Sequence, residues 1–258
     1  MGSNARVLYF DIETLPNTGL FFELGKTNIS YQQIIKEGKI FCICWKWGHE
    51  RRIHSLVMNL KLHDRLAYDD DADKEMLIKF VKVYNSADYA VGHNAFKFDK
   101  GWIRGRLFKH GLTDLEPILI DDTYLASKNL RLNCHKLDYL SRYLGMSRKV
   151  KTDFQLWVDA YHGDIKAYHT MVKYCKNDVF PLLEEMHTRL IPFGDFKFNH
   201  AAFNGDRMMC PRCGGHLVKH DKRLSIGLQI RQQYKCTECG KYVTTGENLL
   251  KTPGKYPR

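Results

Sequence analysis

The strand predicted over residues 7–14 ends in two acids, and it constrains the fold more than any other stretch of the chain. It reads Val-Leu-Tyr-Phe-Asp-Ile-Glu-Thr, an apolar run that closes on Asp11 and Glu13. Because alternate residues of an extended strand share one face, the two carboxylates point toward the same spot. Such a pair suits a hard divalent cation with oxygen ligands. Such a pair is more often a solvated acidic edge of a sheet, so the pair alone does not establish a metal site.

Charge and composition indicate a folded protein with an anionic partner. The 258 residues are 44% hydrophobic and carry a formal net charge of +11. A basic excess favours nucleic acid as the partner, although a merely soluble basic surface is the alternative. No apolar run approaches the ~20 residues of a membrane span, so no membrane association is expected. Eight cysteines without a secretory signal indicate a reducing cytoplasm, which is the host cytoplasm if the chain is phage-encoded.

The order of predicted elements indicates an α/β domain on a mixed sheet. Three strands come first, and later strands alternate with helices. The acid run at 69–73 is expected to cap the helix that follows it. Pro181 is expected to kink or split the last helical region. The strands are predicted at 7–14, 40–47, 51–58, 88–92 and 118–121, and the helices at 76–84, 101–110, 137–144 and 164–190.

Two further acidic motifs follow the first in a fixed order. Asp99 ends an Asn-x-x-x-Phe-Asp stretch that opens a helix. Tyr174 and Asp178 are four residues apart and so share one helix face. Taken alone, the second of these motifs also fits a buried tyrosine beside a capping acid. The ordered set of three motifs is more specific than any one of them.

Over residues 6–190 the chain resembles the tyrosine subclass of the DEDD 3′→5′ exonuclease superfamily. Lys173 stands where the sister subclass has a histidine, and Pro181, so soon after Asp178, departs from the usual pattern. The matching residues are Asp11 and Glu13 in the first motif, Asp99 in the second, Tyr174 and Asp178 in the third, and Asp121, Asp122, Thr123, Leu137 and Leu140 in the intervening segment.

The resemblance implies a ribonuclease H-like fold and a two-metal-ion hydrolysis. Asp11 would bridge two Mg²⁺ or Mn²⁺ ions, Glu13, Asp99 and Asp178 would complete their ligand shells, and Tyr174 would orient the attacking water. The expected reaction converts single-stranded nucleic acid, DNA in preference to RNA, to nucleoside monophosphates from the 3′ end. The alternatives are an endonuclease, or a catalytically silent protein that binds nucleic acid or a replisome component.

The resemblance also implies substrate contacts and a stand-alone enzyme of phage or prokaryotic type. Thr14, Leu15, Asn94 and Phe98 would contact the substrate, with ordinary core packing as the alternative for Leu15 and Phe98. Asp121 and Asp122 are interpreted as helix-capping or structural acids and not as ligands.

The C-terminal region contains two C-x-x-C pairs and predicts a small zinc ribbon. Four thiolates form a closed tetrahedral Zn²⁺ site that is structural and not catalytic. The alternative, a redox-active C-x-x-C motif, is disfavoured because such a motif has a single pair beside a βαβ unit. Lysines, arginines and tyrosines around the pairs suit nucleic acid, and docking to a replication or repair protein is the alternative. The predicted domains are residues 1–196 and 197–258, and the four cysteines are Cys210, Cys213, Cys236 and Cys239.

Overall fold

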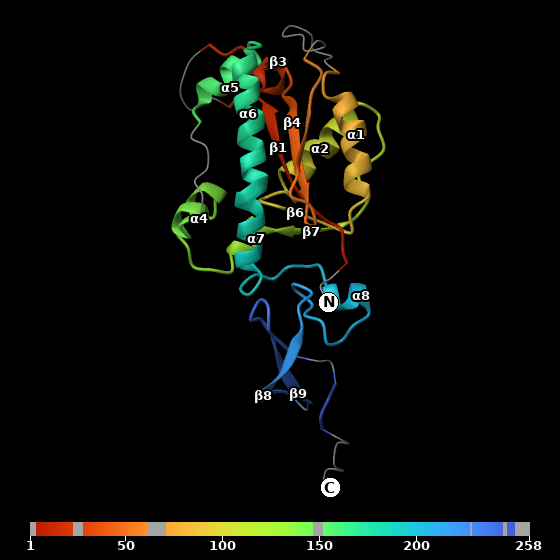
Figure 1. Ribbon diagram of the computed structural model, residues 1–258. Helices are drawn as coiled ribbons and strands as arrows, with labels where there is room; N and C mark the ends of the chain where they lie inside the picture. The colour runs from red at the N-terminus through yellow and green to blue at the C-terminus, as the bar shows by residue number, and fades with distance from the viewer. Residues whose placement is uncertain are drawn as a thin grey trace. The chain divides into compact units, whose positions relative to one another are not determined.

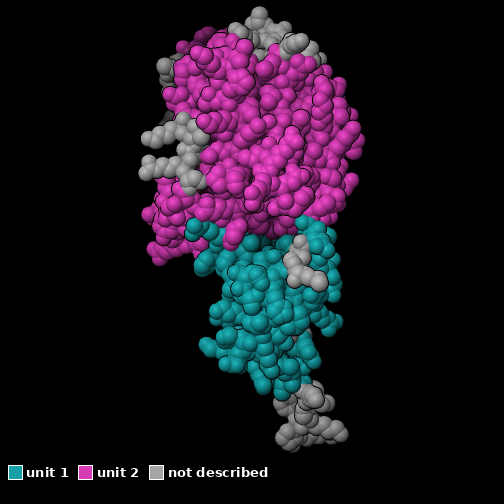
Figure 2. All heavy atoms as spheres, in the orientation of Figure 1, with its two compact units in different colours: residues 1–5, 189–258 teal, residues 6–188 magenta. Residues whose placement is uncertain are grey.

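The computed structural model describes residues 4–22, 28–60, 71–146, 152–227, 229–244 and 247–250. The chain divides into one unit over residues 6–188 and a second over 189–258 together with the N-terminal end, coloured separately in Figure 2. The predicted boundary between residues 196 and 197 stays a prediction. A short helix, α8 (His200–Asn204), precedes the first C-x-x-C pair.

A mixed sheet forms the centre of the larger unit, and β1 is its middle strand. β1 pairs antiparallel with β4 and parallel with β6. This arrangement confirms the predicted α/β class, with antiparallel strands first and parallel strands alternating with helices afterwards. Among the described residues the order is β5-β4-β1-β6-β7. The bounds are β1 Val7–Leu15, β4 Lys39–Trp47, β5 Ile53–Val57, β6 Tyr89–Gly92 and β7 Leu119–Asp122, with β2 Thr18–Gly19 and β3 Ile34–Lys36 as a separate pair.

Helices cover both faces of the sheet (Figure 1). On one face Phe10 of β1 packs against Phe80 and Tyr84 of α1, with ring centroids 5.7 and 6.0 Å apart. On the other face α6 contacts β1 and β4. The helices are α1 Lys74–Asn85, α2 Asp99–Lys109, α3 Thr123–Ser127, α4 Leu137–Tyr143, α5 Phe154–Tyr161, α6 Ile165–Asn177 and α7 Glu184–Leu190.

Pro181 breaks the last long helical region, as its sequence position predicts. Phe180 leaves helical geometry, with φ −145° and ψ 128°, inside a wide turn, η2 (Asp178–Leu183), between α6 and α7. Proline removes a backbone donor and clashes with the preceding turn, so the helix cannot continue through it unchanged. Asp178 therefore lies at the point where regular helix ends.

The acid run before α1 places Asp73 at the N-cap position of that helix. Asp73 precedes the helix but makes no capping hydrogen bond with its side chain. Its buried carboxylate instead pairs with Arg106, Nε to Oδ2 at 2.7 Å. Asp73 therefore occupies the predicted N-cap position, but its carboxylate pairs with a residue of α2 instead of the helix backbone. Asp69 and Asp70 lie outside the described residues.

The second unit contains a small antiparallel sheet in the order β10-β9-β8. Its strands are β8 Leu217–Ile226, β9 Gln229–Cys236 and β10 Tyr242–Thr244. No helix within the described ranges is both long and apolar enough to cross a bilayer.

Candidate active site and four-cysteine cluster

Three of the four predicted acidic ligands lie together. Asp11, Glu13 and Asp178 each place a carboxylate oxygen within 4.8 Å of the others. Asp11 and Glu13 come from β1, where strand alternation puts them on one face. Asp178 is supplied by the C-terminal end of α6. The register between β1 and β4 shifts directly after Glu13, and such irregularities are frequent beside active sites.

Asp99 stands apart from this group in the part of the chain that is described. It is the first residue of α2 and is buried, and its Oδ1 accepts a hydrogen bond from the backbone N–H of Ile12 at 3.1 Å. Burial raises the pKa of Asp99 to about 7, while the Ile12 hydrogen bond opposes the shift and the charge of Asp122 adds to it. Ile12 lies between Asp11 and Glu13, so Asp99 borders the cluster through this backbone contact.

Tyr174 lines a cleft together with Asp11 and Asp178. The cleft has a volume of about 700 Å³. The Tyr174 ring packs edge-on against Trp157 of α5, with centroids 6.1 Å apart. The phenol therefore comes from the same helix end as Asp178 and opens into the same space as Asp11. The remaining lining residues are His93, Asn94, Tyr124, Lys136, Leu137, Asp138 and Thr152.

Three buried cysteines, Cys42, Cys44 and Cys175, lie next to the acids and were not predicted from the sequence. Cys44 and Cys42 of β4 stand opposite Asp11 and Glu13 in the sheet register. Together with Cys175 of α6 they form a buried group with sulfur atoms within 4.8 Å of one another. Burial raises the pKa of the Cys175 thiol, which keeps it protonated and able to donate. The alternation of Cys42 and Cys44 was a signal that both side chains share a face, but nothing local pointed to Cys175.

The loop after β6 is held by Asp122. Asp122 Oδ1 accepts a hydrogen bond from the backbone N–H of Asn94 at 2.9 Å, and Asp122 Oδ2 accepts one from the backbone N–H of Phe96 at 3.1 Å. The Asp122 side chain also accepts from Tyr124 N–H and Leu125 N–H, which makes it the N-cap of α3. The structural interpretation of Asp122 is confirmed. Asn94 has φ +65°, a left-handed conformation that asparagine tolerates better than most residues, and it lies at the edge of the cleft.

The predicted substrate contacts differ in their surroundings. Asn94 lines the cleft, and Phe98 is 43% exposed in a neighbouring groove. Leu15 is only 1% exposed and packs in the core. Thr14 is paired with Ile40 in the sheet. Contacts of these residues with a nucleotide stay predictions.

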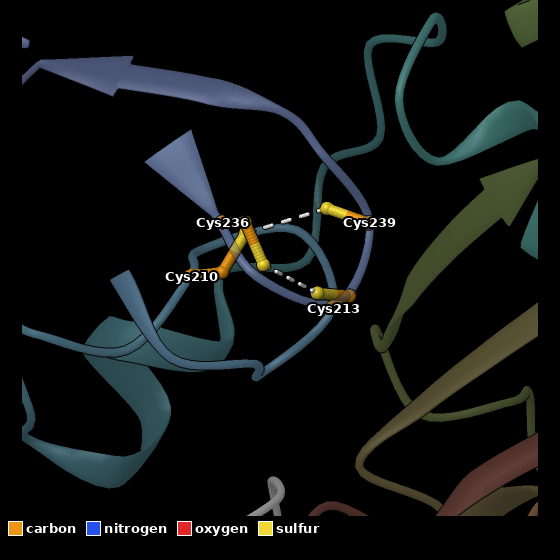
Figure 3. Close-up of side chains that lie close together, drawn as sticks. All are labelled: Cys210, Cys213, Cys236 and Cys239. Carbon is orange, nitrogen blue, oxygen red and sulfur yellow. Dashed lines mark hydrogen bonds between the residues drawn. The ribbon is translucent and has the colours of Figure 1, made fainter. Parts of the chain in front are cut away.

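The four cysteines of the second unit converge on one point. Figure 3 shows their side chains directed toward one another from the two C-x-x-C turns. Cys210 Sγ is 3.9 Å from Cys239 Sγ, and Cys213 Sγ is 3.5 Å from Cys236 Sγ. The backbone N–H of Gly215 also points at Cys213 Sγ, at 3.4 Å. Gly240 has φ +73°, a conformation that glycine adopts without a steric penalty.

The chemistry of the two donor sets distinguishes the cations that each could hold. Carboxylate oxygens from Asp11, Glu13 and Asp178 suit hard divalent cations such as Mg²⁺ or Mn²⁺. Four convergent sulfurs suit a closed Zn²⁺ site with no open position for substrate. Among the described residues, the acidic cluster and the four-cysteine cluster are thus candidate sites for chemically different metals.

The fold of this chain is similar to part of a much larger protein. A family B DNA polymerase from the hyperthermophilic archaeon Pyrobaculum calidifontis superposes with a TM-score of 0.51 at 16% sequence identity. The match covers 73% of this chain and 25% of the polymerase chain. No protein-family model matches the sequence, and no curated protein matches it. The similarity establishes a shared fold with a quarter of a DNA polymerase.

Proposed function

We propose that this chain is a metal-dependent 3′→5′ exonuclease that hydrolyses single-stranded nucleic acid, DNA in preference to RNA, to nucleoside monophosphates. The observation that carries the proposal is the meeting of Asp11, Glu13 and Asp178 within 4.8 Å at a cleft that Tyr174 also lines. The ordered motifs that resemble the DEDD exonucleases and the fold shared with part of a DNA polymerase support the same class of substrate.

Asp11, Glu13, Asp178 and Asp99 would hold two Mg²⁺ or Mn²⁺ ions. Bound divalent cations would neutralise the phosphodiester and lower the pKa of the attacking water. Asp99 would join the ligands by giving up its proton, because a nearby cation favours the charged form of a carboxylate whose pKa is raised. Four thiolates of the second unit would hold one structural Zn²⁺.

Tyr174 has the chemistry to orient water and not to deprotonate it. A phenol has an ordinary pKa near 10, which makes it a weak base at neutral pH. Its hydroxyl can still donate and accept hydrogen bonds at the cleft surface. The positive net charge of the chain would favour approach of the polyanionic strand to an otherwise acidic site.

Single strands labelled at either end test this function. DNA and RNA strands would be incubated with Mg²⁺ or Mn²⁺, with EDTA, and with the Asp11→Ala variant. We expect early release of the 3′ label as a mononucleotide, no cleavage in EDTA, and loss of several orders of magnitude in rate for Asp11→Ala. Glu75→Ala is the matched control, since Glu75 is an exposed acid of α1 on the opposite face of the sheet. Full activity in EDTA or in Asp11→Ala would refute the proposal.

The second candidate is a binding protein on the same scaffold. The basic charge and the four-cysteine unit favour it, because neither requires catalysis. A chain that binds single strands tightly but leaves both labels intact in every metal would belong to this class.

A further inference from the structure

A second hollow adjoins the candidate active cleft. Its volume is about 1040 Å³, in the range of sites that enclose a ligand of nucleotide size or larger. Asn94 and Tyr124 line both hollows, so the groove begins where the cleft ends. It is formed by the loop over residues 94–98, by α2 and by α3. A strand whose 3′ end occupied the cleft would meet this groove next.

Aromatic side chains gather along the groove and remain accessible. Phe96 is 55% exposed and Phe98 is 43% exposed. Phe98 lies edge-on to Trp102 of α2, with centroids 6.4 Å apart. A cluster of accessible rings beside a cleft differs from scattered surface hydrophobics, because several rings are open to contact within one groove. Planar bases stack on such rings with little dependence on sequence.

Two of the α2 residues that line the groove are glycines. Gly101 and Gly105 are one turn apart on α2 and therefore share a face of the helix. A Cβ atom added to either glycine would meet no other atom within 4 Å, so open space lies over both. Glycine inside a helix weakens that helix relative to alanine. Two glycines at this spacing leave room for a flat ring to approach the helix backbone.

The charge around the groove is positive, in contrast to the cleft. Lys97, Lys109 and Lys128 line it, and Lys128 Nζ is 4.5 Å from the centroid of the Tyr124 ring. Lys109 is 28% exposed and 3.8 Å from Asp71 Oδ1, a loose pair that water can separate. Of the two acids that line the groove, Asp122 is engaged by backbone amides, which leaves Glu37.

We propose that this groove binds the nucleotides that precede the 3′-terminal residue of a single strand. A base lies over Gly101 and Gly105 and stacks with Trp102, while the lysines contact phosphates. The proposal rests on the proposed function, because the cleft fixes which end of the strand enters. It assigns to the groove the preference for single strands over duplex, since only unpaired bases present their faces to the rings.

Equilibrium binding in EDTA tests the groove without any hydrolysis. Thymidylate strands from a dinucleotide to a dodecamer would be titrated against the full chain and followed by fluorescence anisotropy. Trp102→Ala should weaken the dodecamer by roughly 5- to 150-fold, the factor that corresponds to one lost stacking contact. The dinucleotide, which fills only the cleft, should be unaffected, and Trp102→Phe should restore most of the affinity. Phe108→Ala is the matched control, because Phe108 is an exposed ring of the same helix that does not line the groove.

The Gly105→Leu variant tests the groove without the risk that weaker binding reflects a loss of folding. The added side chain favours the helix and meets open space, so the variant should fold at least as well as the wild type. It should nevertheless weaken the dodecamer, because leucine occupies space within the groove. Lys97→Ala should flatten the slope of log K against log salt by about 0.7, the value for one phosphate contact with a single strand.

The outcomes separate this inference from the proposed function. If long strands bind with Trp102 dependence but are never cut, the groove stands and the exonuclease proposal falls. If strands are cut but Trp102→Ala and Gly105→Leu bind all lengths like the Phe108→Ala control, the groove proposal is overturned while the exonuclease proposal stands.

Discussion

The thiol of Cys175 donates a hydrogen bond to the backbone oxygen of Asp11, with the sulfur 3.4 Å from that oxygen. The same sulfur is 3.6 Å from Asp11 Oδ2. Cys175 lies on α6 between Tyr174 and Asp178, so this contact joins the first acidic motif to the last. Both partners are separated by 164 positions in the chain. A small buried thiol thus lies at the contact between α6 and β1.

Enlarging this side chain should disturb the site more than the fold. Cys175→Leu adds atoms to a position with no exposed surface, and overpacking of this kind costs about 1–3 kcal/mol. The larger side chain should displace α6 from β1 and so move Tyr174 and Asp178 relative to Asp11. We therefore expect a large fall in kcat on single strands with only a modest fall in melting temperature. Cys175→Ala should retain most activity. Cys134→Leu, at a partly exposed position, is the control. Wild-type kcat in Cys175→Leu would show that the contact does not position the acids.

Tyr174→Phe tests the assignment of the phenol. The ring and its packing against Trp157 are kept and only the hydroxyl is lost. A positioned group that orients or transfers a proton contributes roughly 10²–10⁴-fold to rate. We expect a fall of that size in kcat with little change in metal binding or melting temperature. Tyr143→Phe, an exposed tyrosine of α4, provides the comparison. Unchanged turnover at saturating substrate would return Tyr174 to a packing role.

The sheet could be predicted from sequence because its signals are local. Alternation and apolar runs located β1, β4 and β6, and Gly145, with φ +64°, follows α4 where the predicted helix stops. Asp73 could not be assigned, because its partner Arg106 is 33 residues away and no local pattern joins them. Acids before a helix usually cap it, and here a buried ion pair took precedence.

Only the residues of the three ordered acidic motifs could be predicted as part of the candidate site. Asp11, Glu13 and Asp178 lie together, whereas Asp99 is outside that group and accepts a hydrogen bond from the Ile12 backbone beside it. The groove over α2 was invisible in the sequence. Its walls come from segments as distant as residues 37 and 128. In the sequence, Gly101 and Gly105 indicate only a weakened helix, and their place in the groove follows from the fold.

The buried pair of Asp73 and Arg106 should contribute strongly to stability. Asp73→Ala would leave the Arg106 guanidinium buried without its partner, which costs roughly 3–5 kcal/mol. Asp114→Ala, which removes the partner of the exposed Arg104 on the same helix, should have a far smaller effect on the free energy of unfolding. Denaturant titration measures both variants. Equal changes would show that the buried pair contributes no more than the surface pair.

The same carboxyl gives the protein a defined acid sensitivity. Burial tends to raise the pKa of Asp73, but hydrogen bonds from Arg106 and His110 outweigh it and hold the pKa below its usual range. The folded chain thus binds this proton less readily than the unfolded chain does. Its stabilisation is fully present above the pKa of an unfolded aspartate, about 3.9, and is lost as pH falls through the lower native value. Between pH 5 and 2 the wild type should lose more stability than Asp73→Ala, as measured by urea midpoints.

Zinc should support the four-cysteine cluster without taking part in hydrolysis. A unit with so small a core depends on metal binding for its folding free energy, which is on the order of 10 kcal/mol for comparable sites. Elemental analysis should find one zinc ion per chain and none in a Cys213→Ser, Cys236→Ser double variant.

The last prediction is that the four-cysteine unit acts on substrate capture and not on chemistry. Four sulfurs around one ion leave no position at which water could be activated. The basic residues of this unit can instead displace counterions from a phosphate backbone, a contribution that weakens as salt rises. Removal of the chain from Asn199 onward should therefore raise KM for long single strands and flatten its salt dependence, while kcat on very short oligonucleotides hardly changes. The melting curve of the truncated chain controls for folding. If it binds long strands as tightly as the full chain, the unit does not grip nucleic acid, and docking to a replication or repair protein becomes the better explanation of its surface.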